Sequence, residues 1–166
     1  MPAPATTYND DLELLRSSAV AAGIIASGFF RRDVKSWTKE NSSPVSEADI
    51  LVDRYLAASL LQARPDYGWL SEETVDNPSR LDCERVFVVD PIDGTRGFLR
   101  GEDSWTVSLA VVEDGVPVAG VVYSPVRNEM YDAVKGEGAR LNGRPLERSR
   151  RAGAAPIIPA AGAVHQ

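Results

Sequence analysis

The sequence predicts an α+β fold in which two N-terminal helices pack on a largely antiparallel sheet. Two observations support this prediction. Up to about residue 63, apolar residues recur with the three-and-four spacing of amphipathic helices, and from residue 67 onward short β-branched or aromatic runs alternate with turn signals. A length of 166 residues fits one domain with a single core. A helical layer on a meandering sheet is therefore the expected architecture.

The two helices are predicted from the positions of apolar residues and of a capping signal. The first is predicted over residues 10–33. Its apolar face is formed by residues at helical spacing: Leu12, Leu15, Ala19, Ala22, Ala26 and Phe30. Residues 37–44 are polar and contain a proline, so a loop is expected there. Ser46 begins Ser-Glu-Ala-Asp, a capping-box pattern, and the second helix is predicted to follow it to about Ala63.

The strands are predicted from short apolar runs that lie between turn signals. They are expected at residues 67–71, 85–89, 105–111, 116–123 and 130–134. The run 85–89 is apolar enough to be buried on both faces. In the run 105–111 the apolar residues Trp105, Val107, Leu109 and Val111 alternate onto one face. Asp114-Gly115 and Asn142-Gly143 indicate tight turns between strands.

Composition and charge exclude several kinds of partner. The formal net charge is -6 and no basic stripe is present, which argues against nucleic acid, because binding to a phosphate backbone requires clustered Lys and Arg. No apolar run approaches the roughly 18 residues of a membrane helix, and the N-terminus does not resemble a signal peptide. With a single cysteine, these features predict a cytoplasmic protein, and the acidic charge still allows a small phosphorylated molecule as its partner. An acidic protein would need a cation to bind such a molecule.

The densest chemical signal is the sequence Val-Phe-Val-Val-Asp-Pro-Ile-Asp-Gly-Thr, residues 86–95. A buried strand there delivers Asp90 and Asp93 to the point where the chain turns. Gly94 permits a positive φ or the close approach of a ligand. The two carboxylates and the Ile92 carbonyl are hard oxygen donors of the kind that Mg²⁺ prefers. A plain surface turn is the alternative, because Asp-Gly is common in turns.

Other acidic residues favour the metal site. Glu72 and Glu73 follow the strand 67–71, so a second strand end also delivers carboxylates; the alternative is a solvated acidic pair, above all for Glu73. Asp49 stands at the start of the second helix, where it completes the capping box, joins a metal site, or does both. The only histidine is His165, which leaves almost no material for Ser-His catalysis or a histidine-ligated zinc site. Metal-activated water is the remaining nucleophile.

These residues resemble a known signature. They are similar to the signature of the inositol monophosphatase superfamily. The matching segments are Lys39, Ser-Pro-Val-Ser-Glu-Ala-Asp49, Glu72-Glu73 and Asp90-Pro-Ile-Asp-Gly-Thr95. The resemblance extends over residues 10–146. It implies phosphomonoesterase activity, a cofactor of two or three Mg²⁺ ions and a possible homodimer. By resemblance, Glu72, Asp90 and the Ile92 carbonyl bind one ion, and Asp90 and Asp93 hold a second.

The resemblance also implies roles in catalysis and substrate binding. Glu72 and Thr95 would orient the attacking water, with Asp49 behind them in a supporting or third-metal role. Asp93 and the backbone N–H groups of Gly94 and Thr95 would meet the substrate phosphate. Lys39 matches a lysine near the metal site and is a further candidate for substrate binding.

One branch of the superfamily is favoured by the residues after the metal motif. Arg96 and Phe98 resemble the form seen in 3'(2'),5'-bisphosphate nucleotidases, which convert 3'-phosphoadenosine 5'-phosphate to AMP, and the segment Val-Val-Tyr-Ser-Pro at 121–125 is similar to that branch. A basic residue at Arg96 would bind a second phosphate. An inositol 1-phosphate or histidinol phosphate phosphatase remains an alternative, as does a non-catalytic remnant.

The resemblance stops short of the whole family pattern. Family members continue into a second α/β layer with a Trp-Asp motif, and no acidic residue follows Glu147 here. The expectation is an N-terminal metal-binding domain over residues 1–147, an Ala/Gly/Pro-rich, weakly ordered tail over 148–166, and no C-terminal domain. Without that domain, the sheet face with Trp105, Val107 and Leu109 is expected to lose part of its cover.

Overall fold

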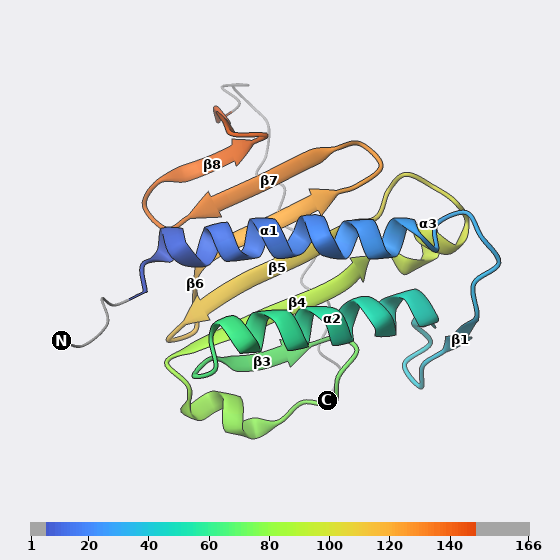
Figure 1. Cartoon of the computed structure of the whole chain (residues 1–166), viewed down its shortest axis with the longest axis horizontal. Coiled ribbons are helices and arrows are strands. Elements are labelled where there is room, and N and C mark those ends of the chain that lie inside the picture. Colours follow the sequence, from blue (N-terminus) through green and yellow to red (C-terminus); the bar gives the residue numbers. More distant parts are fainter. Residues whose placement is uncertain (1–5, 149–166) are drawn as a thin grey trace, which may run out of the picture.

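The computed structural model describes residues 6–148, which form helices on one face of a mixed sheet (Figure 1). The helices are α1 (Tyr8–Ser27), α2 (Glu47–Ala63) and the short α3 (Thr95–Leu99), with a 3-10 turn, η1 (Pro78–Asp82). The main sheet contains β3 (Gly68–Ser71), β4 (Arg85–Asp93), β5 (Thr106–Glu113), β6 (Val116–Ser124), β7 (Glu129–Val134), β8 (Gly138–Leu141) and β9 (Arg144–Pro145). The predicted α+β class is confirmed.

The strands of the main sheet lie in chain order from β3 to β9, and only the β3–β4 pair is parallel. Every later pair is antiparallel; α3 and a loop join β4 to β5, and short turns join the strands that follow. The Asn142-Gly143 turn joins β8 to β9, and both residues have positive φ. The largely antiparallel sheet of the prediction is therefore found, with one parallel pair at its edge.

Both long helices begin with a capping box. Thr7 accepts a hydrogen bond from the Asp10 backbone N–H, and the Asp10 carboxylate accepts one from the Thr7 N–H. Ser46 and Asp49 make the same reciprocal bonds at the start of α2, which confirms the predicted helix from Ser46 to Ala63. These bonds satisfy N–H groups that have no partner within the helix.

The first helix ends earlier than predicted, at Ser27 rather than near residue 33. Gly28 caps it, and Arg31 then takes a positive φ of 57°. The Arg31 guanidinium donates hydrogen bonds to the Gly101 carbonyl and to Asp103, in the loop that follows α3. The chain that follows the helix is thus tied to this loop.

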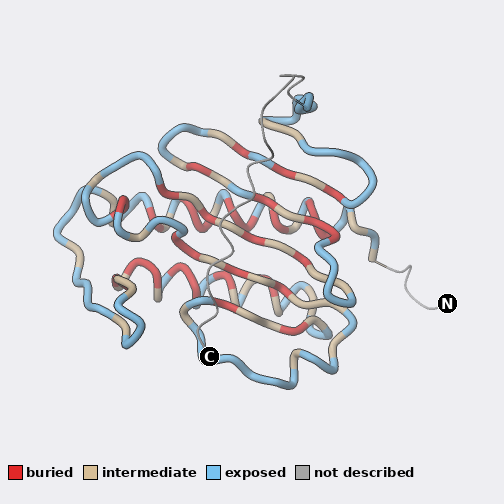
Figure 2. Tube along the Cα trace, turned by 180° about the vertical axis from the view of Figure 1, so that it is seen from behind, coloured by how far each residue is buried: buried red, intermediate tan, exposed pale blue. Residues whose placement is uncertain are grey.

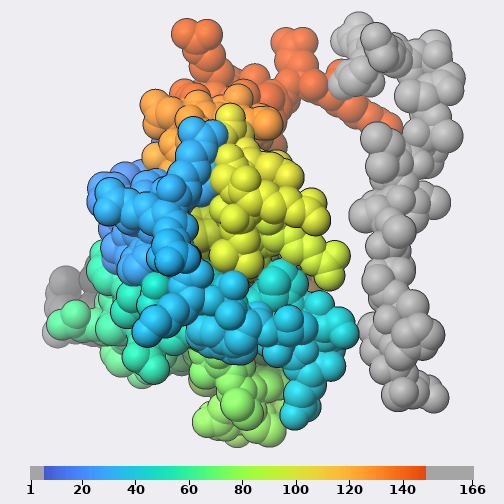
Figure 3. Space-filling model, turned by 90° about the vertical axis from the view of Figure 1, so that its right-hand side faces the viewer, coloured from blue at the N-terminus to red at the C-terminus, as the bar shows by residue number. Residues whose placement is uncertain are grey.

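The segment predicted as a loop over residues 37–44 contains a small hairpin. Its strands are β1 (Ser36–Thr38) and β2 (Pro44–Ser46), paired with Trp37 opposite Val45. A strand of three residues is too short to show the alternation of apolar and polar residues by which strands are recognised in sequence. Figure 3 shows this hairpin, the chain after α1 and the segment around α3 against one another on one side of the molecule.

The core lies between the sheet and the helices, and it corrects one expectation. Trp105, Val107 and Leu109 are fully buried under the helical layer, so they do not belong to a face that lacks cover. The less covered face is the opposite one, seen in Figure 2, to which Val88, Ala110 and other half-buried residues belong. The alternation was predicted correctly, but the face that the helices cover was assigned wrongly.

Two remaining observations concern the ends and the surface of the chain. The predicted tail over 148–166 lies, from residue 149 onward, outside the described residues. Within the described part of the chain, no helix combines the length and the apolar character needed to cross a membrane.

Candidate functional site

The parallel pair β3–β4 brings Glu72 and Asp90 to the same edge of the sheet. Ser71 is paired with Val89, and the Glu72 backbone N–H donates to the Val89 carbonyl at 3.3 Å. Glu72 and Asp90 are therefore the next residues along two neighbouring strands that run in the same direction. Carboxyl ends of parallel strands are a common location for binding sites.

A bulge in β4 adds Asp93 to this edge. Asp90 is opposite Ser108 and Asp93 is opposite Thr106, so four residues of β4 face three of β5. Ile92, inside the bulge, is 1% exposed, whereas Asp93 is exposed. The strand continues through the Asp-Pro-Ile-Asp motif and ends at Asp93, four residues beyond its predicted end.

Gly94 is required at the turn from β4 into α3. Its φ is +90°, and an added Cβ would lie 2.7 Å from the Ser104 carbonyl oxygen. Any other residue would meet both backbone strain and a clash with the main chain. This glycine lets the chain turn directly from Asp93 into Thr95.

Thr95 and Asp49 are joined by their side chains. The Thr95 hydroxyl lies 2.9 Å from Asp49 Oδ1 and 3.0 Å from the Ile92 carbonyl oxygen. The other oxygen of Asp49 accepts hydrogen bonds from the Ser46 N–H and hydroxyl, at 2.8 and 2.6 Å. Asp49 is fully buried. It therefore caps α2 and contacts Thr95 at the same time.

Lys39 contacts the acidic turn rather than open solvent. Its ammonium group lies 2.6 Å from Glu73 Oε2 and donates to the Glu72 carbonyl at 3.1 Å. The Glu73 side chain is only 3% exposed, and burial raises its pKa despite the nearby lysine. The predicted alternative of a solvated Glu73 is thus wrong. Arg96 is exposed on α3.

The charges around Asp90 are unbalanced. Burial raises the pKa of Asp90 to about 7, and the negative charges of Glu72, Asp93, Asp49 and Glu73 add to the effect. Carboxylates that disfavour one another's ionisation form a setting in which a divalent cation is favourable, and oxygen donors suit Mg²⁺. In the described residues, no three Asp, Glu, His or Cys side chains are already arranged to hold a metal ion. The fit is therefore one of charge and donor type.

Asp53 is a residue of this region that the sequence patterns did not single out. It is buried on α2, four residues after Asp49, and accepts hydrogen bonds from the hydroxyls of Ser71 and Thr74. The separation of four residues on one helix was the signal that could have found it, because it places both carboxylates on the same face.

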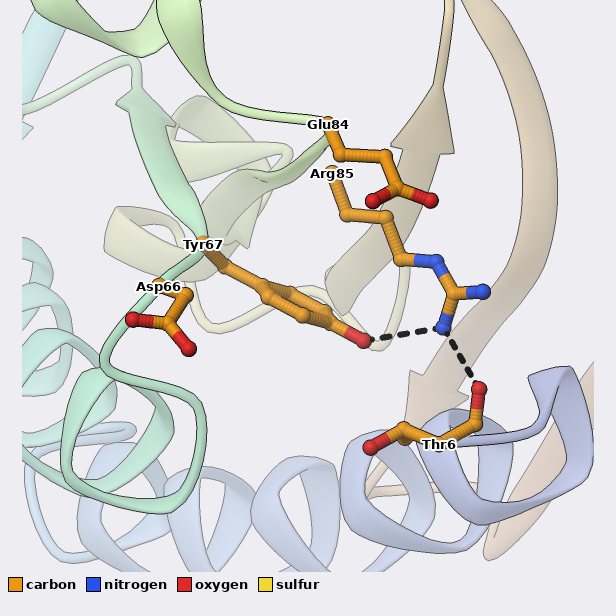
Figure 4. A pocket seen from close by; sticks show the side chains of 5 residues that line it. All are labelled: Thr6, Asp66, Tyr67, Glu84 and Arg85. Carbon is orange, nitrogen blue, oxygen red and sulfur yellow. Dashed lines mark hydrogen bonds between the residues drawn. The ribbon is translucent and has the colours of Figure 1, made fainter. Parts of the chain in front are cut away.

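Among the cavities of the described residues, one lies beside α1 and a larger one beside α2. One of about 230 Å³ is near the start of α1, where Arg85 donates hydrogen bonds to the Tyr67 hydroxyl and the Thr6 carbonyl (Figure 4). Arg85 also pairs with Asp11 and Glu113, so its charge is balanced within the fold. A larger cavity of about 580 Å³ lies between α2 and the segment that includes η1.

The fold and the site together define an α+β domain with a carboxylate-rich site at the carboxyl ends of two parallel strands. A model of the inositol monophosphatase family matches residues 10–165. The chain belongs to this family.

Individual relatives are similar to the chain over most of its length. It is 34% identical to a histidinol-phosphatase of Chlorobaculum parvum, over 84% of this chain and 53% of that protein. It is 38% identical to the 3'(2'),5'-bisphosphate nucleotidase CysQ of Escherichia coli, over 75% of this chain and 50% of that one. The crystal structure of the extragenic suppressor protein suhB from Bartonella henselae superposes with a TM-score of 0.80 at 32% identity, over 85% and 55% of the two chains. The chain thus spans about half the length of the curated relatives it matches.

Proposed function

We propose that this chain carries the metal-binding part of a Mg²⁺-dependent phosphomonoesterase. The proposed ligands are Glu72, Asp90, Asp93 and the Ile92 carbonyl. The observation that carries the proposal is the convergence of two parallel strand ends, which deliver Glu72 and Asp90 to one edge, with Asp93 added by the bulge. Such an edge needs a divalent cation before it can bind a phosphate, because carboxylate and phosphate oxygens repel each other.

The Thr95 hydroxyl is proposed to orient the attacking water. Its single hydrogen can be donated to Asp49 or to the Ile92 carbonyl, so a lone pair of its oxygen is left to accept a hydrogen bond from water. Glu72 is proposed to accept the other hydrogen of that water. Asp49 acts through Thr95 and is therefore a positioning residue. Mg²⁺, when bound, would lower the pKa of a coordinated water and neutralise phosphate oxygens.

Substrate contacts are proposed on the turn after β4. The phosphate would meet Asp93 through a shared cation and meet the backbone at Gly94 and Thr95. Lys39 is already paired with Glu73, so we assign it to holding the acidic turn instead of the substrate. Arg96 is exposed beside Thr95 and is free to approach a second phosphate group.

The proposed substrate is 3'-phosphoadenosine 5'-phosphate, converted to AMP. Support comes from Arg96 and from 38% identity to a bisphosphate nucleotidase. A histidinol phosphate phosphatase is the second candidate, favoured by 34% identity to a histidinol-phosphatase over a larger share of the chain. The two candidates differ in whether the substrate carries a second phosphate.

Calorimetric titration with Mg²⁺ tests the metal site. Asp90→Asn and Asp93→Asn should each weaken Mg²⁺ binding. Each removes a negative charge from the site, and that charge is needed to displace water from a strongly hydrated ion. Asp114→Asn, the same chemical change in an exposed turn between β5 and β6, should leave binding unchanged. Binding by both site variants at the strength of the parent chain would show that the ligands are assigned wrongly.

Phosphate release tests the substrate. The chain is incubated in Mg²⁺ with 3'-phosphoadenosine 5'-phosphate, histidinol phosphate or inositol 1-phosphate at equal concentrations. The nucleotide should be hydrolysed fastest, and Arg96→Ala should lower its rate more than that of either monophosphate. Equal rates on all three would remove the nucleotidase assignment, and metal binding without turnover would favour a non-catalytic remnant.

A further inference from the structure

Asp53 is a buried carboxylate that the proposed metal site does not use. It lies on α2 and is 6% exposed. Both of its oxygens are taken by hydroxyl donors: Ser71 donates to Oδ1, and Thr74 donates to Oδ2 at 2.7 Å. A carboxylate removed from water must be satisfied by such donors, since leaving it unpaired costs several kcal/mol.

The two hydroxyls that donate to Asp53 also accept hydrogen bonds, one from the main chain and one from an aromatic side chain. A hydroxyl has one hydrogen, so Ser71 and Thr74, once they donate to Asp53, can only accept further hydrogen bonds. Ser71 accepts one from the Glu73 backbone N–H at 3.2 Å. Thr74 accepts one from Trp69 Nε1 at 3.4 Å. Asp53 thereby directs the two hydroxyl hydrogens and leaves both hydroxyl oxygens to accept from these N–H groups.

These hydrogen bonds enclose the turn that carries Glu72. Ser71 immediately precedes Glu72, and Thr74 follows Glu73. Asp53 therefore accepts hydrogen bonds from both ends of the turn. Lys39 also holds the turn, through the Glu72 carbonyl and the Glu73 carboxylate. Glu72 itself is exposed and has room to meet a ligand.

We infer that Asp53 is a positioning residue for the metal site: it fixes the turn from Ser71 to Thr74 so that Glu72 is held at the edge beside Asp90. The inference rests on the proposed function, because it takes Glu72 as a metal ligand. A role in folding stability alone would leave the metal affinity of the folded protein unchanged. A positioning role predicts that this affinity falls. Groups that orient ligands in this way typically change metal affinity about 10- to 100-fold.

The test measures Mn²⁺ affinity by electron paramagnetic resonance, with Mn²⁺ as a hard, oxygen-seeking substitute for Mg²⁺. Asp53→Asn, Ser71→Ala and Thr74→Val are compared with the parent chain. The last two leave the charge unchanged, which separates positioning from the electric field of Asp53. Each of the three should weaken Mn²⁺ binding by about 10-fold. In metal-free protein, the Glu73 amide should exchange its hydrogen faster in all three.

Asp11→Asn is the matched control. Asp11 is also a buried carboxylate and accepts hydrogen bonds from Arg64, Tyr67 and Arg85, but it lies on α1 in the cluster around Arg85. This variant should lower the unfolding temperature and leave Mn²⁺ affinity unchanged. If Asp53→Asn does not fold, the two hydroxyl variants decide the question by themselves.

The outcomes separate the inference from the function on which it rests. Weaker Mn²⁺ binding in Ser71→Ala and Thr74→Val supports positioning by Asp53. Weaker binding in Asp53→Asn alone would overturn it and leave an effect of charge. Parent-like affinity in all three variants would overturn it while the metal site stands. A parent chain that binds no Mn²⁺ would overturn the proposed function and the inference with it.

Discussion

Asp90, which we propose as a metal ligand, opposes the stability of its own fold when it is ionised. Its pKa rises from an ordinary 3.8 to about 7 in the folded state. Below about pH 4 the carboxyl is protonated in both states. Between there and pH 7 the unfolded chain ionises and the folded one does not, so folding stability falls as pH rises, and above pH 7 the penalty is complete. Three pH units correspond to at most about 4 kcal/mol.

Asp90→Asn should therefore stabilise the metal-free chain at pH 8 and have little effect near pH 4. Thermal unfolding in a chelator measures this, with Asp93→Asn as the matched variant on the exposed side of the bulge, where the gain should be smaller. Saturating Mg²⁺ should reverse the order, because the parent gains more from binding than the variant. Equal unfolding temperatures of parent and Asp90→Asn at pH 8 would show that burial does not disfavour the charge.

Gly94 allows a second residue-level prediction. Gly94→Ala should destabilise the chain by more than the roughly 1–2 kcal/mol of a left-handed residue, because its Cβ also meets the Ser104 carbonyl oxygen. Gly115→Ala is the control: its φ is +76° with nothing within 4 Å of the added Cβ, so only the conformational cost remains. Urea unfolding measures the loss of stability in both variants. Equal losses would show that the contact with the Ser104 carbonyl oxygen adds no cost.

Residue types and spacing were enough to select the residues of the candidate site but not the contacts between them. The run from Asp90 to Thr95 was selected because it concentrates oxygen donors at a strand end. The Thr95 contact with Asp49 joins residues 46 positions apart, and no periodicity records such a contact. Asp53 could have been found from its separation of four residues from Asp49, but its contacts with Ser71 and Thr74 could not, because those residues lie outside α2.

At the scale of elements, the capping box of α2 links a helix start to the site. Ser46→Ala removes a hydroxyl that binds Asp49 and should cost about 1 kcal/mol of stability. It should also weaken Mg²⁺ binding, because Asp49 then holds Thr95 less firmly. Thr7→Ala removes the corresponding group from α1 and should cost similar stability with no change in Mg²⁺ affinity. Chemical unfolding measures the stability of both variants, and calorimetry measures their Mg²⁺ affinity. Equal Mg²⁺ affinities of Ser46→Ala and Thr7→Ala would refute a link between the capping box and the metal site.

Elements with long, regular patterns were predicted well, and those defined by distant contacts were not. The second helix and the Asn142-Gly143 hairpin follow from local signals, which the structure confirms. After the early end of α1, Arg31 contacts Gly101 and Asp103, and these contacts link positions about 70 residues apart. The β1–β2 hairpin was missed because three residues are too few to show alternation.

At the scale of the whole molecule, alternation along a strand tells which residues share a face but not which face is covered. Val107 and Leu109 lie under the helices, whereas Ala110 lies on the opposite side. That opposite face is also lined by valines, among them Val122, which is 38% exposed. Between residues 6 and 148 the helices cover one side of the sheet, and the other side keeps an apolar face that can pair with another surface.

We therefore expect the 166-residue chain to associate with itself through this face at high concentration. Val122→Lys places a charge on the face at an already exposed position, so it should reduce association without lowering the unfolding temperature. Val75→Lys is the matched control, because Val75 is 92% exposed but lies in the segment after β3. It should associate like the parent. Sedimentation velocity over a range of concentrations measures both, and a parent chain that stays monomeric throughout would show that this sheet face does not drive association.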